Sequence, residues 1–423
     1  MNYEKTKQLT KKRWAVLVAS CMINLCIGSL YVWSVFAAPM ADYLSSVTLS
    51  AITASDLAIV FTIANSVGPV TLISGGMIND KFGPKWVVFL GGLLFGIGMI
   101  GSGFAKSIPS LMVSYGLGCG LGMGLVYGCT INNSVKLFPD RRGLVGGIAT
   151  ASYGISSVVI PPIANVCIHR MGIIPTFKLL GIVFILVICI GAFFIEKCPE
   201  GFVPAGYEEK MAQKKNGGKD KKEHTRIQEE KNWRQMLQDP VFYIMITMLT
   251  CGAVFGLMTI SQASPIAQQM IGMSVMSATT AVSVLALFNT LGRVAAGYLS
   301  DIIGRINVLM IMLVSSIPGL LLICTSGIGD VVKFYIGVSI IGLCFGSFMG
   351  VFPGFTADQF GQKNNSVNYG IMFIGFALAG YLGPTIMNQV YSASGNYSLA
   401  FVIAIGLAVL GILLSLLYRR KTR

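Results

Sequence analysis

The stretch GGMINDKFGPK, residues 75–85, returns later in the chain as AGYLSDIIGR, residues 296–305. Both stretches contain the pattern Gly-x-x-x-Asp-x-x-Gly, which begins at Gly76 in the first copy and at Gly297 in the second. A pattern that recurs at so long an offset, about half the length of the chain, indicates internal duplication. It predicts that the chain consists of two copies of one structural unit.

Glycine residues elsewhere in the chain support this duplication. They occur at every fourth position in one segment of each half, and the two sets keep the offset of the motif copies to within one position: Gly116, Gly120, Gly124 and Gly128, then Gly342, Gly346 and Gly350. Glycine at this spacing leaves one smooth face on a helix, which lets a neighbouring backbone approach closely. Phe138 with Phe360 and Pro162 with Pro384 keep the same offset, so the two copies extend over most of the chain.

The composition places these copies in a membrane. Of the 423 residues, 54% are hydrophobic and 11% are charged, whereas soluble domains carry about 25% charged residues. An apolar segment of about 20 residues can cross a bilayer as a helix. Twelve such segments lie at residues 14–38, 53–77, 86–105, 108–134, 143–164, 175–195, 241–265, 276–298, 307–327, 332–356, 368–390 and 397–418. We therefore predict an all-α membrane protein with twelve transmembrane helices in two six-helix bundles.

A charged segment separates the two halves. Residues 196–240 include the run EKMAQKKNGGKDKKEHTRIQEEKNWR, which has no apolar period, and we interpret them as a solvated, partly disordered linker. The predicted units are an N-terminal tail at 1–13, a six-helix bundle at 14–195, the linker at 196–240, a second six-helix bundle at 241–418 and a C-terminal tail at 419–423.

The distribution of positive charge predicts the orientation in the membrane. The tails, the linker and the loops on the same side carry 26 of the 31 Lys and Arg residues, whereas the opposite loops carry Lys106, Arg170, Lys178 and Lys333. Cytoplasmic loops carry an excess of Lys and Arg, so we predict that both termini and the linker are cytoplasmic. Because the charge alternates from loop to loop, the net charge of +14 does not indicate nucleic acid as a partner.

Residues typical of catalysis or metal binding are not gathered in any motif. The ten cysteines lie mostly within apolar segments and form no Cys-x-x-Cys pair, and the two histidines, His169 and His224, lie in loops. We find no candidate triad and no phosphate-binding loop. The sequence therefore predicts that the protein is not an enzyme and has no cofactor and no metal site.

Arg293, within the stretch FNTLGRVAAGYLSDIIGR at 288–305, lies inside a predicted span. A positive charge there costs about 2.5–3.5 kcal/mol on insertion scales. The side chain could snorkel to the interface, because Asp301 follows two helical turns later, about 12 Å along the axis. The position that corresponds to Arg293 in the first copy is Leu72, so the repeat itself does not require the charge. Since an arginine fork matches a carboxylate, we interpret Arg293 as an anchor for an anion, with Asn289 on the same helical face.

The repeated stretch resembles the signature loop of the major facilitator superfamily, and the copy at 297–305 is its weaker second form. The resemblance covers nearly the whole chain and implies two six-helix bundles that work by alternating access. It also implies a latch between adjacent helices at the cytoplasmic ends of the second and eighth spans, although a solvated charged helix end is the simpler alternative. The gating role carries over to Gly76, Asp80, Lys81, Gly83, Lys85, Gly297, Asp301, Gly304 and Arg305.

Finer motifs resemble the oxalate:formate antiporter family within this superfamily. They are YVWSVF (31–36), VYG (126–128), FPDRRGL (138–144), SYG (152–154), PEGFVPAGY (199–207) and NYG (368–370). That family carries small carboxylates, and its bacterial branches include oxalate/formate exchangers and pyruvate carriers. We expect a monomer in the inner (plasma) membrane of a bacterial cell. Its partners would be the lipid bilayer, a small organic anion as substrate, and protons or a counter-transported anion.

The resemblance also implies which residues form the substrate cavity. The family positions that carry over are Arg293, Tyr31, Tyr127, Tyr153, Phe345, Met349 and Phe373. A tyrosine hydroxyl can donate to a carboxylate while its ring fills an apolar wall, although aromatic packing is an equally simple role for each ring. Related monocarboxylate carriers have a proton-coupling aspartate at the position of Asn289, and an asparagine does not titrate.

One departure from the family pattern concerns the charge of the substrate. A second cation of the oxalate exchanger falls on Phe376 in this chain. One cation in an otherwise apolar pocket suits a monoanion, because a second carboxylate would be buried without a partner. We therefore predict a secondary active transporter of a small monocarboxylate such as pyruvate, lactate or formate, closest to the pyruvate-type branch. Carboxylate antiport of the oxalate:formate type and a non-transporting carboxylate sensor are the alternatives.

Overall fold

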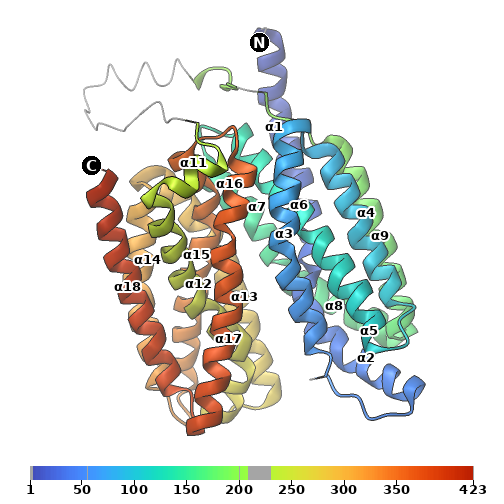
Figure 1. Ribbon diagram of the computed structural model, residues 1–423. Helices are drawn as coiled ribbons and strands as arrows, with labels where there is room; N and C mark the ends of the chain where they lie inside the picture. Colours follow the sequence, from blue (N-terminus) through green and yellow to red (C-terminus); the bar gives the residue numbers. More distant parts are fainter. Residues whose placement is uncertain (1–2, 55, 200, 208–229, 423) are drawn as a thin grey trace.

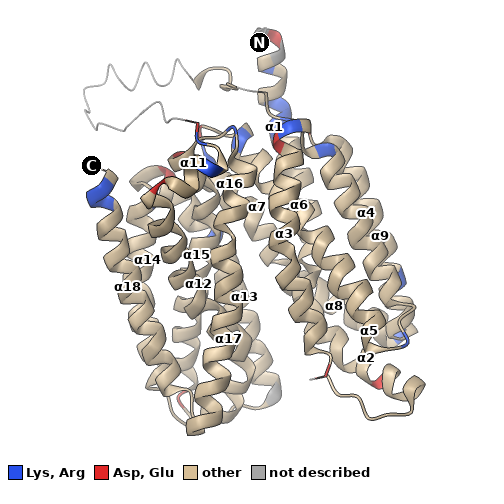
Figure 2. Cartoon of the chain, in the orientation of Figure 1, with Lys and Arg blue, Asp and Glu red and all other residues tan. Residues whose placement is uncertain are grey.

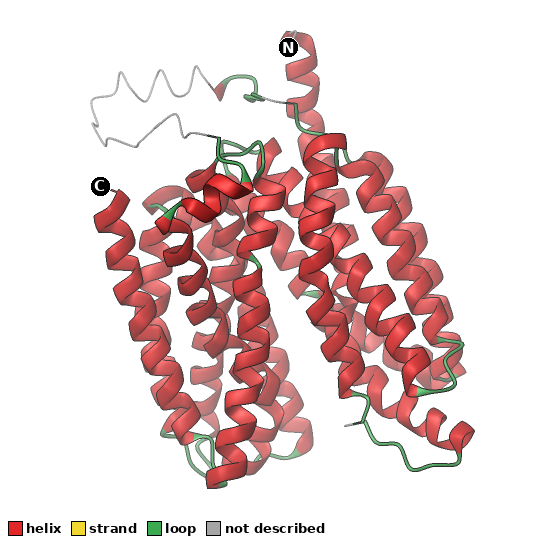
Figure 3. Ribbon diagram, in the orientation of Figure 1, coloured by secondary structure: helices red, strands yellow, loops and turns green. Residues whose placement is uncertain are grey.

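The computed structural model describes residues 3–54, 56–199, 201–207 and 230–422. These residues form helices and loops and contain no strand (Figure 3). Twelve helical segments of the described chain are long and apolar enough to cross a membrane. The predictions of an all-α fold and of twelve transmembrane helices are therefore confirmed.

The first half of the chain forms six of these segments, and three of them combine more than one helix. The helices are α1 (Tyr3–Ile27), η1 (Gly28–Val32), α2 (Trp33–Thr48), α3 (Ala58–Phe82), α4 (Pro84–Ser102), α5 (Ile108–Leu111), η2 (Met112–Cys119), α6 (Gly120–Leu137), α7 (Arg142–Gly154), α8 (Ser156–Met171) and α9 (Ile173–Phe194). The first segment joins α1, η1 and α2, the fourth joins α5, η2 and α6, and the fifth joins α7 and α8.

The second half has the same succession of segments, preceded by a short helix. Its helices are α11 (Trp233–Gln238), α12 (Pro240–Pro265), η3 (Ile266–Met270), α13 (Val275–Ile303), α14 (Arg305–Cys324), α15 (Val331–Phe360), α16 (Asn365–Met372), α17 (Ile374–Ser394) and α18 (Ser398–Thr422). Because α16 and α17 together form one segment, the fifth span of each half is divided into two helices.

The last glycine of the repeated motif forms a tight turn in both halves. Gly83 has a φ of 95° and Gly304 has a φ of 88°, a region of backbone conformation that glycine adopts without steric cost. Each glycine is the single residue between two helices, α3 and α4 in the first half and α13 and α14 in the second. The motif therefore ends on glycine because the chain reverses direction there.

The glycine stripes pack two equivalent pairs of helices closely together. A Cβ atom on Gly120 of α6 would lie 2.5 Å from the carbonyl oxygen of Ala64 on α3. In the second half, a Cβ atom on Gly342 of α15 would lie 2.7 Å from the carbonyl oxygen of Leu285 on α13. Both distances are shorter than any ordinary Cβ contact, so these backbones can touch only because the residues are glycine.

The helices form two groups that meet along a shared face. Figure 1 shows α1 to α9 on one side of the molecule and α12 to α18 on the other. Contacts between the groups involve mainly α7 with α13 and α15, and α3 with α16. Both chain ends and both described ends of the linker lie at one end of the molecule, which we call the terminal end (Figure 1). Lys and Arg residues gather at this end (Figure 2).

The tail and the linker differ in part from the sequence-based expectation. The predicted tail at 1–13 is helical from Tyr3 onward and continues without a break into the first span. The linker contains α11, whose N-cap residue Asn232 accepts a hydrogen bond from the backbone N–H of Gln235. Residues 208–229, which hold most of the charged linker, lie outside the described residues.

Candidate functional site

Arg293 of α13 is buried where the two halves meet, and only 1% of its surface is exposed. Its Nη1 donates to the backbone carbonyl of Thr150 on α7 at 2.8 Å, a bond between the two halves. Its Nε donates to Oδ1 of Asn289, one turn earlier on α13, at 3.3 Å. The side chain therefore points into the interior of the protein, and the snorkelling geometry is not the one observed.

Small residues around Arg293 make room for it. A Cβ atom on Gly350 of α15 would lie 2.9 Å from the Arg293 Cα, and one on Gly147 of α7 would meet its carbonyl oxygen. A Cβ atom on Gly154 would lie 3.4 Å from both Cζ and Nε of the guanidinium. Glycine at these three positions thus lets α7, α13 and α15 converge around one long, charged side chain.

The charge of Arg293 is not balanced by the protein groups that touch it. Its two hydrogen-bond acceptors, the Thr150 carbonyl and the Asn289 amide oxygen, are neutral. Among the described residues Arg293 takes part in no ion pair within 4.0 Å, although eight other such pairs are present. Burying a charge is costly unless it is paired. An anion bound at this place would supply the missing charge.

A narrow pocket lies in front of Arg293, and its cavity volume is about 20 Å³. The residues that line it come from both halves and are Tyr31, Asn65, Gly68, Pro69, Leu72, Met123, Tyr127, Tyr153, Arg293, Met349, Phe373 and Phe376. Arg293 is the one charged side chain among these twelve described residues. A mostly apolar cavity with a few convergent polar groups is the usual form of a small-molecule site.

Tyrosines from the first half form one wall of the pocket. Tyr153 contacts Tyr31 and Tyr127 edge to face, with a distance of 5.0 Å between ring centroids in each pair. Tyr31 and Tyr127 line the same pocket as the Arg293 guanidinium. Their hydroxyls and the guanidinium can therefore donate to the same bound carboxylate.

The opposite wall consists of phenylalanines at the junction between α16 and α17 and at the start of α17. Phe373 and Phe376 stack with 4.6 Å between ring centroids, and Phe373 also lies 5.7 Å from the ring of Tyr127. Phe345 of α15 stacks behind Phe376 at 6.4 Å and is itself buried. This wall is apolar over its whole depth, so a group placed against it gains burial but no compensating charge.

The structure brings six of the eight predicted substrate residues to the pocket surface: Arg293, Tyr31, Tyr127, Tyr153, Phe373 and Phe376. Asn289 and Phe345 lie behind them, where Asn289 orients Arg293 and Phe345 supports Phe376. The sequence analysis missed Asn65 and Leu72, which lie on α3, and Tyr369, whose ring centroid lies 5.9 Å from that of Phe373. Tyr369 belongs to the NYG motif, which could have suggested it.

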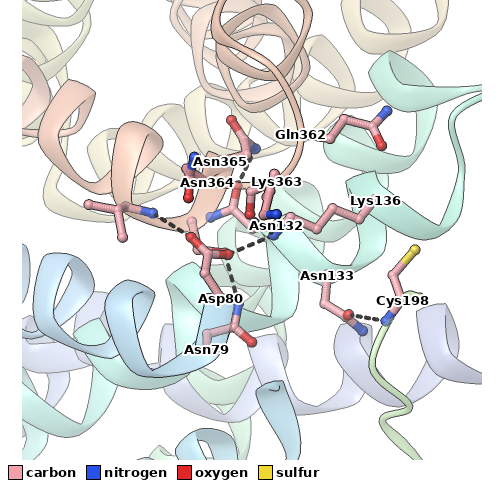
Figure 4. A network of polar contacts seen from close by, with 12 residues as sticks. Asn79, Asp80, Asn132, Asn133, Lys136, Cys198, Gln362, Lys363, Asn364 and Asn365 are labelled. Carbon is pink, nitrogen blue, oxygen red and sulfur yellow. Dashed lines mark hydrogen bonds and ion pairs between the residues drawn. The ribbon is translucent and has the colours of Figure 1, made fainter. Parts of the chain in front are cut away.

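The aspartate of the first motif copy joins the two halves at the terminal end. Asp80 on α3 pairs with Lys136 on α6 at 2.6 Å and accepts a hydrogen bond from the backbone N–H of Val367 on α16 at 3.3 Å (Figure 4). Lys136 also donates to the carbonyl of Lys363 at 3.1 Å. We call these four residues the first latch. Since its polar contacts connect α3 and α6 with α16 and the turn before it, the halves are held together here.

The predicted cations of the first motif copy do not pair with Asp80. The ammonium group of Lys81 lies 5.4 Å from the ring centroid of Phe82, and that of Lys85 lies 4.6 Å from the ring centroid of Phe193. Asp80 pairs instead with Lys136, which is 56 positions away in sequence. The reason is geometric, because α6 packs beside α3 and brings Lys136 to the end of that helix.

The aspartate of the second copy makes an equivalent contact. Asp301 pairs with Arg305 at 2.6 Å and accepts hydrogen bonds from the backbone N–H groups of Gly143 and Leu144, both at 2.8 Å. Arg305 also donates from Nε to Asp358 at 2.8 Å. We call these five residues the second latch. It joins α13, α14 and α15 of the second half to the start of α7 in the first half.

The first glycine of each motif copy faces the opposite half. A Cβ atom on Gly76 would lie 2.7 Å from the carbonyl oxygen of Ser366, and one on Gly297 would meet the carbonyl oxygen of Gly143. Any larger residue would therefore separate the halves next to a latch. The first glycine and the aspartate of each motif copy thus contact the opposite half, and the final glycine forms the turn that follows them.

The structure has two repeated helical groups, a pocket between them and latches at one end. This arrangement is typical of membrane carriers that open to alternate sides. Residues 16–384 match the Major Facilitator Superfamily. Because this match covers most of the chain, the chain belongs to the Major Facilitator Superfamily and is a multi-pass membrane transporter. Proteins of this superfamily move small substrates, often together with protons or counter-ions.

Curated relatives extend over nearly the same length. The chain is 29% identical over 378 residues to the uncharacterized MFS-type transporter YhjX of Escherichia coli K12, covering 89% of this chain and 86% of the relative. It is 28% identical over 408 residues to the oxalate:formate antiporter of Oxalobacter formigenes, covering 95% and 91%. It is 22% identical over 355 residues to human monocarboxylate transporter 12, covering 78% and 66%.

Solved structures agree with the fold. The fucose transporter FucP in its outward conformation superposes with a TM-score of 0.69 at 12% identity, covering 96% of this chain and 99% of that chain. A double tryptophan mutant of XylE superposes with a TM-score of 0.74 at 15% identity, covering 96% and 94%. The predicted resemblance to the superfamily, with an oxalate:formate antiporter and monocarboxylate transporters among the relatives, is thus confirmed.

Proposed function

We propose that the protein transports a small monocarboxylate, such as pyruvate, lactate or formate, by alternating access. The observation that carries this proposal is the buried Arg293 guanidinium, which faces an aromatic pocket and has only neutral hydrogen-bond partners. A bound carboxylate would pair with the guanidinium and accept hydrogen bonds from Tyr31 and Tyr127. The relatives that are named for oxalate, formate or monocarboxylates support the same chemical class.

The pocket favours one negative charge over two. Arg293 is the one cation among the twelve lining residues, and the opposite wall consists of Phe373 and Phe376. A second carboxylate of a dianion would lie against these rings with no cation to pair with, which is costly in a low dielectric. The methyl group of pyruvate or lactate would instead gain from the same apolar wall.

Exchange against an internal anion is the second candidate, and the lining residues favour it over proton symport through the pocket. The twelve described residues that line the pocket include no Asp, Glu or His. Asn289, which orients Arg293, cannot take up a proton. The oxalate:formate antiporter among the relatives is named for exchange.

The proposed setting is the inner (plasma) membrane of a bacterial cell, with the terminal end in the cytoplasm. The gathering of Lys and Arg at that end supports this orientation (Figure 2). We also retain the division into two six-helix bundles at 14–195 and 241–418, joined by the linker at 196–240, and a monomer as the working unit. In this orientation both latches close the cytoplasmic side of the pocket.

The deciding experiment is uptake by proteoliposomes that contain the purified protein. Labelled pyruvate, lactate, formate and oxalate would each be offered with and without a pH gradient, and with and without internal unlabelled anion. We expect saturable uptake of at least one monocarboxylate in preference to oxalate. Uptake that requires internal anion would identify exchange, and uptake driven by the pH gradient would identify proton symport. A clear preference for oxalate would contradict the argument from charge.

A further inference from the structure

The end of the linker lies across the turn between α15 and α16. The Glu230 carboxylate accepts hydrogen bonds from two successive backbone N–H groups, that of Gln362 at 3.1 Å and that of Lys363 at 2.8 Å. The turn begins at Gly361, with a φ of 91°, and a Cβ atom there would collide with this carboxylate. The turn is therefore shaped to receive Glu230, and hydrogen bonds to an ionised acceptor are among the stronger ones.

Lys231 fixes the same turn through its backbone. Its N–H donates to the carbonyl of Phe360 at 3.0 Å, and its carbonyl accepts from the side-chain amides of Asn364 and Asn368 at 3.4 Å and 3.0 Å. Its ammonium group pairs with Asp239, the N-cap residue of α12, at 2.7 Å. We call Glu230 and Lys231 the strap, because together they tie the turn to the start of the second half.

The strap and the first latch meet at a single residue of this turn. Lys363 donates its backbone N–H to Glu230 and accepts at its backbone carbonyl from Lys136, which in turn pairs with Asp80. Figure 4 shows Lys136 and Asp80 beside this turn. A displacement of the turn would therefore move the Lys363 carbonyl away from Lys136 and draw α16 away from Asp80.

The first half holds its equivalent turn in a similar way. Arg13, just before the first apolar span, donates to both carboxylate oxygens of Asp140 at 2.6 Å and 3.0 Å and to the Leu137 carbonyl at 3.4 Å. Asp140 corresponds to Gln362 at the offset that relates Phe138 to Phe360, so the two turns are equivalent in the repeat. Each half thus uses the segment before its first span to hold the turn before its fifth span.

The Arg13 contact of the first half and the Glu230 contact of the second half differ in charge and in exposure to solvent. Arg13 is buried, with 7% of its surface exposed, and lies over the ring of Phe138 at 4.4 Å. Glu230 is exposed to solvent at the terminal end. A buried bond of this kind is protected from water, whereas the exposed Glu230 carboxylate is held, within the described part of the chain, by the two N–H groups it accepts from. The Glu230 contact is therefore the one of the two that can open without unpacking a helix.

We propose that Glu230 is a positioning residue for the closed terminal end, and that the strap makes the linker part of the conformational switch. With the strap in place, the turn presents Lys363 to Lys136 and the first latch is complete. Release of Glu230 loosens the turn, weakens the first latch and shifts the carrier toward the state that is open at the terminal end. This inference rests on the proposed alternating-access function, but it does not depend on which substrate is carried.

Hydrogen–deuterium exchange of the full-length protein without substrate tests the proposal. Glu230→Ala removes the strap carboxylate, whereas Glu230→Gln keeps an acceptor oxygen without the charge. The matched control is Glu196→Ala, which removes the same charge from the other end of the linker, where Glu196 forms an exposed pair with Lys12. Exchange is read separately in the turn and α16 (361–372) and in the end of α3 (75–82), which the strap does not touch.

We expect Glu230→Ala to accelerate exchange roughly 3- to 10-fold in both segments, a range typical of an exposed hydrogen bond to a charged group. Glu230→Gln should fall between Glu230→Ala and the wild type, and Glu196→Ala should match the wild type. Acceleration confined to 361–372 would show a purely local role and overturn the proposal. Unchanged exchange in both segments, or an equal effect of Glu196→Ala, would overturn it as well. Because no substrate is present, failure of the uptake screen would leave this test intact.

Discussion

Leu72 and Arg293 occupy equivalent positions in the two halves, and both line the same pocket. Around them the repeat is well kept, since α3 packs against α6 as α13 packs against α15, through glycines at matching positions. The residues that hold the fold together therefore follow the symmetry, whereas the residue proposed to meet the substrate breaks it. A packed helix pair serves both halves equally, but one bound anion needs only one guanidinium.

The latches give a second comparison between the halves. Both use the motif aspartate to accept backbone N–H groups of the opposite half. In the second latch the cation is Arg305, one turn from Asp301 across the glycine turn, whereas in the first latch it is Lys136 from a neighbouring helix. The aspartate of each latch is thus part of the repeated motif, whereas the cation that pairs with it comes from a different place in each half. The following predictions test these two comparisons.

Removing the pocket charge is expected to have the largest effect. Arg293→Ala should reduce monocarboxylate uptake to the background of empty vesicles, because truncating one partner of a buried charge pair costs about 2–5 kcal/mol or more. Arg293→Lys should retain a fraction at most, since a point charge cannot make the bidentate contact. Leu72→Ala, at the equivalent position, is the control and should leave substantial uptake. Normal uptake by Arg293→Ala would place the substrate site elsewhere.

Adding a second charge should change the preferred substrate. In Phe376→Lys a second cation faces the pocket, so oxalate should gain relative to pyruvate or lactate by about 1–3 kcal/mol, the range of hydrogen bonds to charged groups. Competition of oxalate against a labelled monocarboxylate in matched vesicles measures this shift. Phe376→Met keeps the wall apolar and should show the wild-type preference. If Phe376→Lys leaves the preference where it was, position 376 does not face the bound anion.

Weakening a latch should affect turnover more than binding. Asp80→Asn and Asp301→Asn each remove a charge at the terminal end, far from the pocket, and so bias the conformational equilibrium. We expect maximal uptake to fall by about 10-fold in either variant, a shift of about 1.4 kcal/mol in that equilibrium. Stabilisation of the purified protein by ligand, measured as a shift in Tm, should remain. Loss of that ligand-induced shift in a folded variant would contradict the gating role.

Replacing Lys136 and Lys81 one at a time tests which cation pairs with Asp80. Lys136→Ala should resemble Asp80→Asn, because it removes the other partner of the same ion pair. Lys81→Ala should change uptake less than about twofold, because its side chain is exposed at the protein surface and exposed charges contribute little. Uptake measured side by side in the two variants decides which cation belongs to the latch. A larger defect in Lys81→Ala would restore the assignment based on the motif alone.

Hydropathy and spacing were enough to predict a duplicated membrane protein, and the family resemblance implied much of its pocket. Apolar length predicts the twelve spans because each helix must satisfy its own backbone hydrogen bonds in a bilayer, which is a local property of the chain. The unusual charge at Arg293 could be recognised because any arginine within an apolar span is costly. The repeat then distinguished it from a packing residue, because Leu72 stands at the matching position.

Partners that lie far apart in sequence could not be predicted in this way. The pairing of Asp80 with Lys136, of Arg293 with the Thr150 carbonyl, and of Glu230 with the turn at Gln362 and Lys363 depends on which helices pack side by side. Hydropathy describes how each helix meets the lipid, and it carries no information on which backbone groups face one another across a contact. The sequence by itself therefore determined the membrane fold, its duplication and the position of the one charge deep within a span. Only the tertiary structure decided what that charge touches and how the two halves are held closed, because both depend on packing between helices that are distant in the chain.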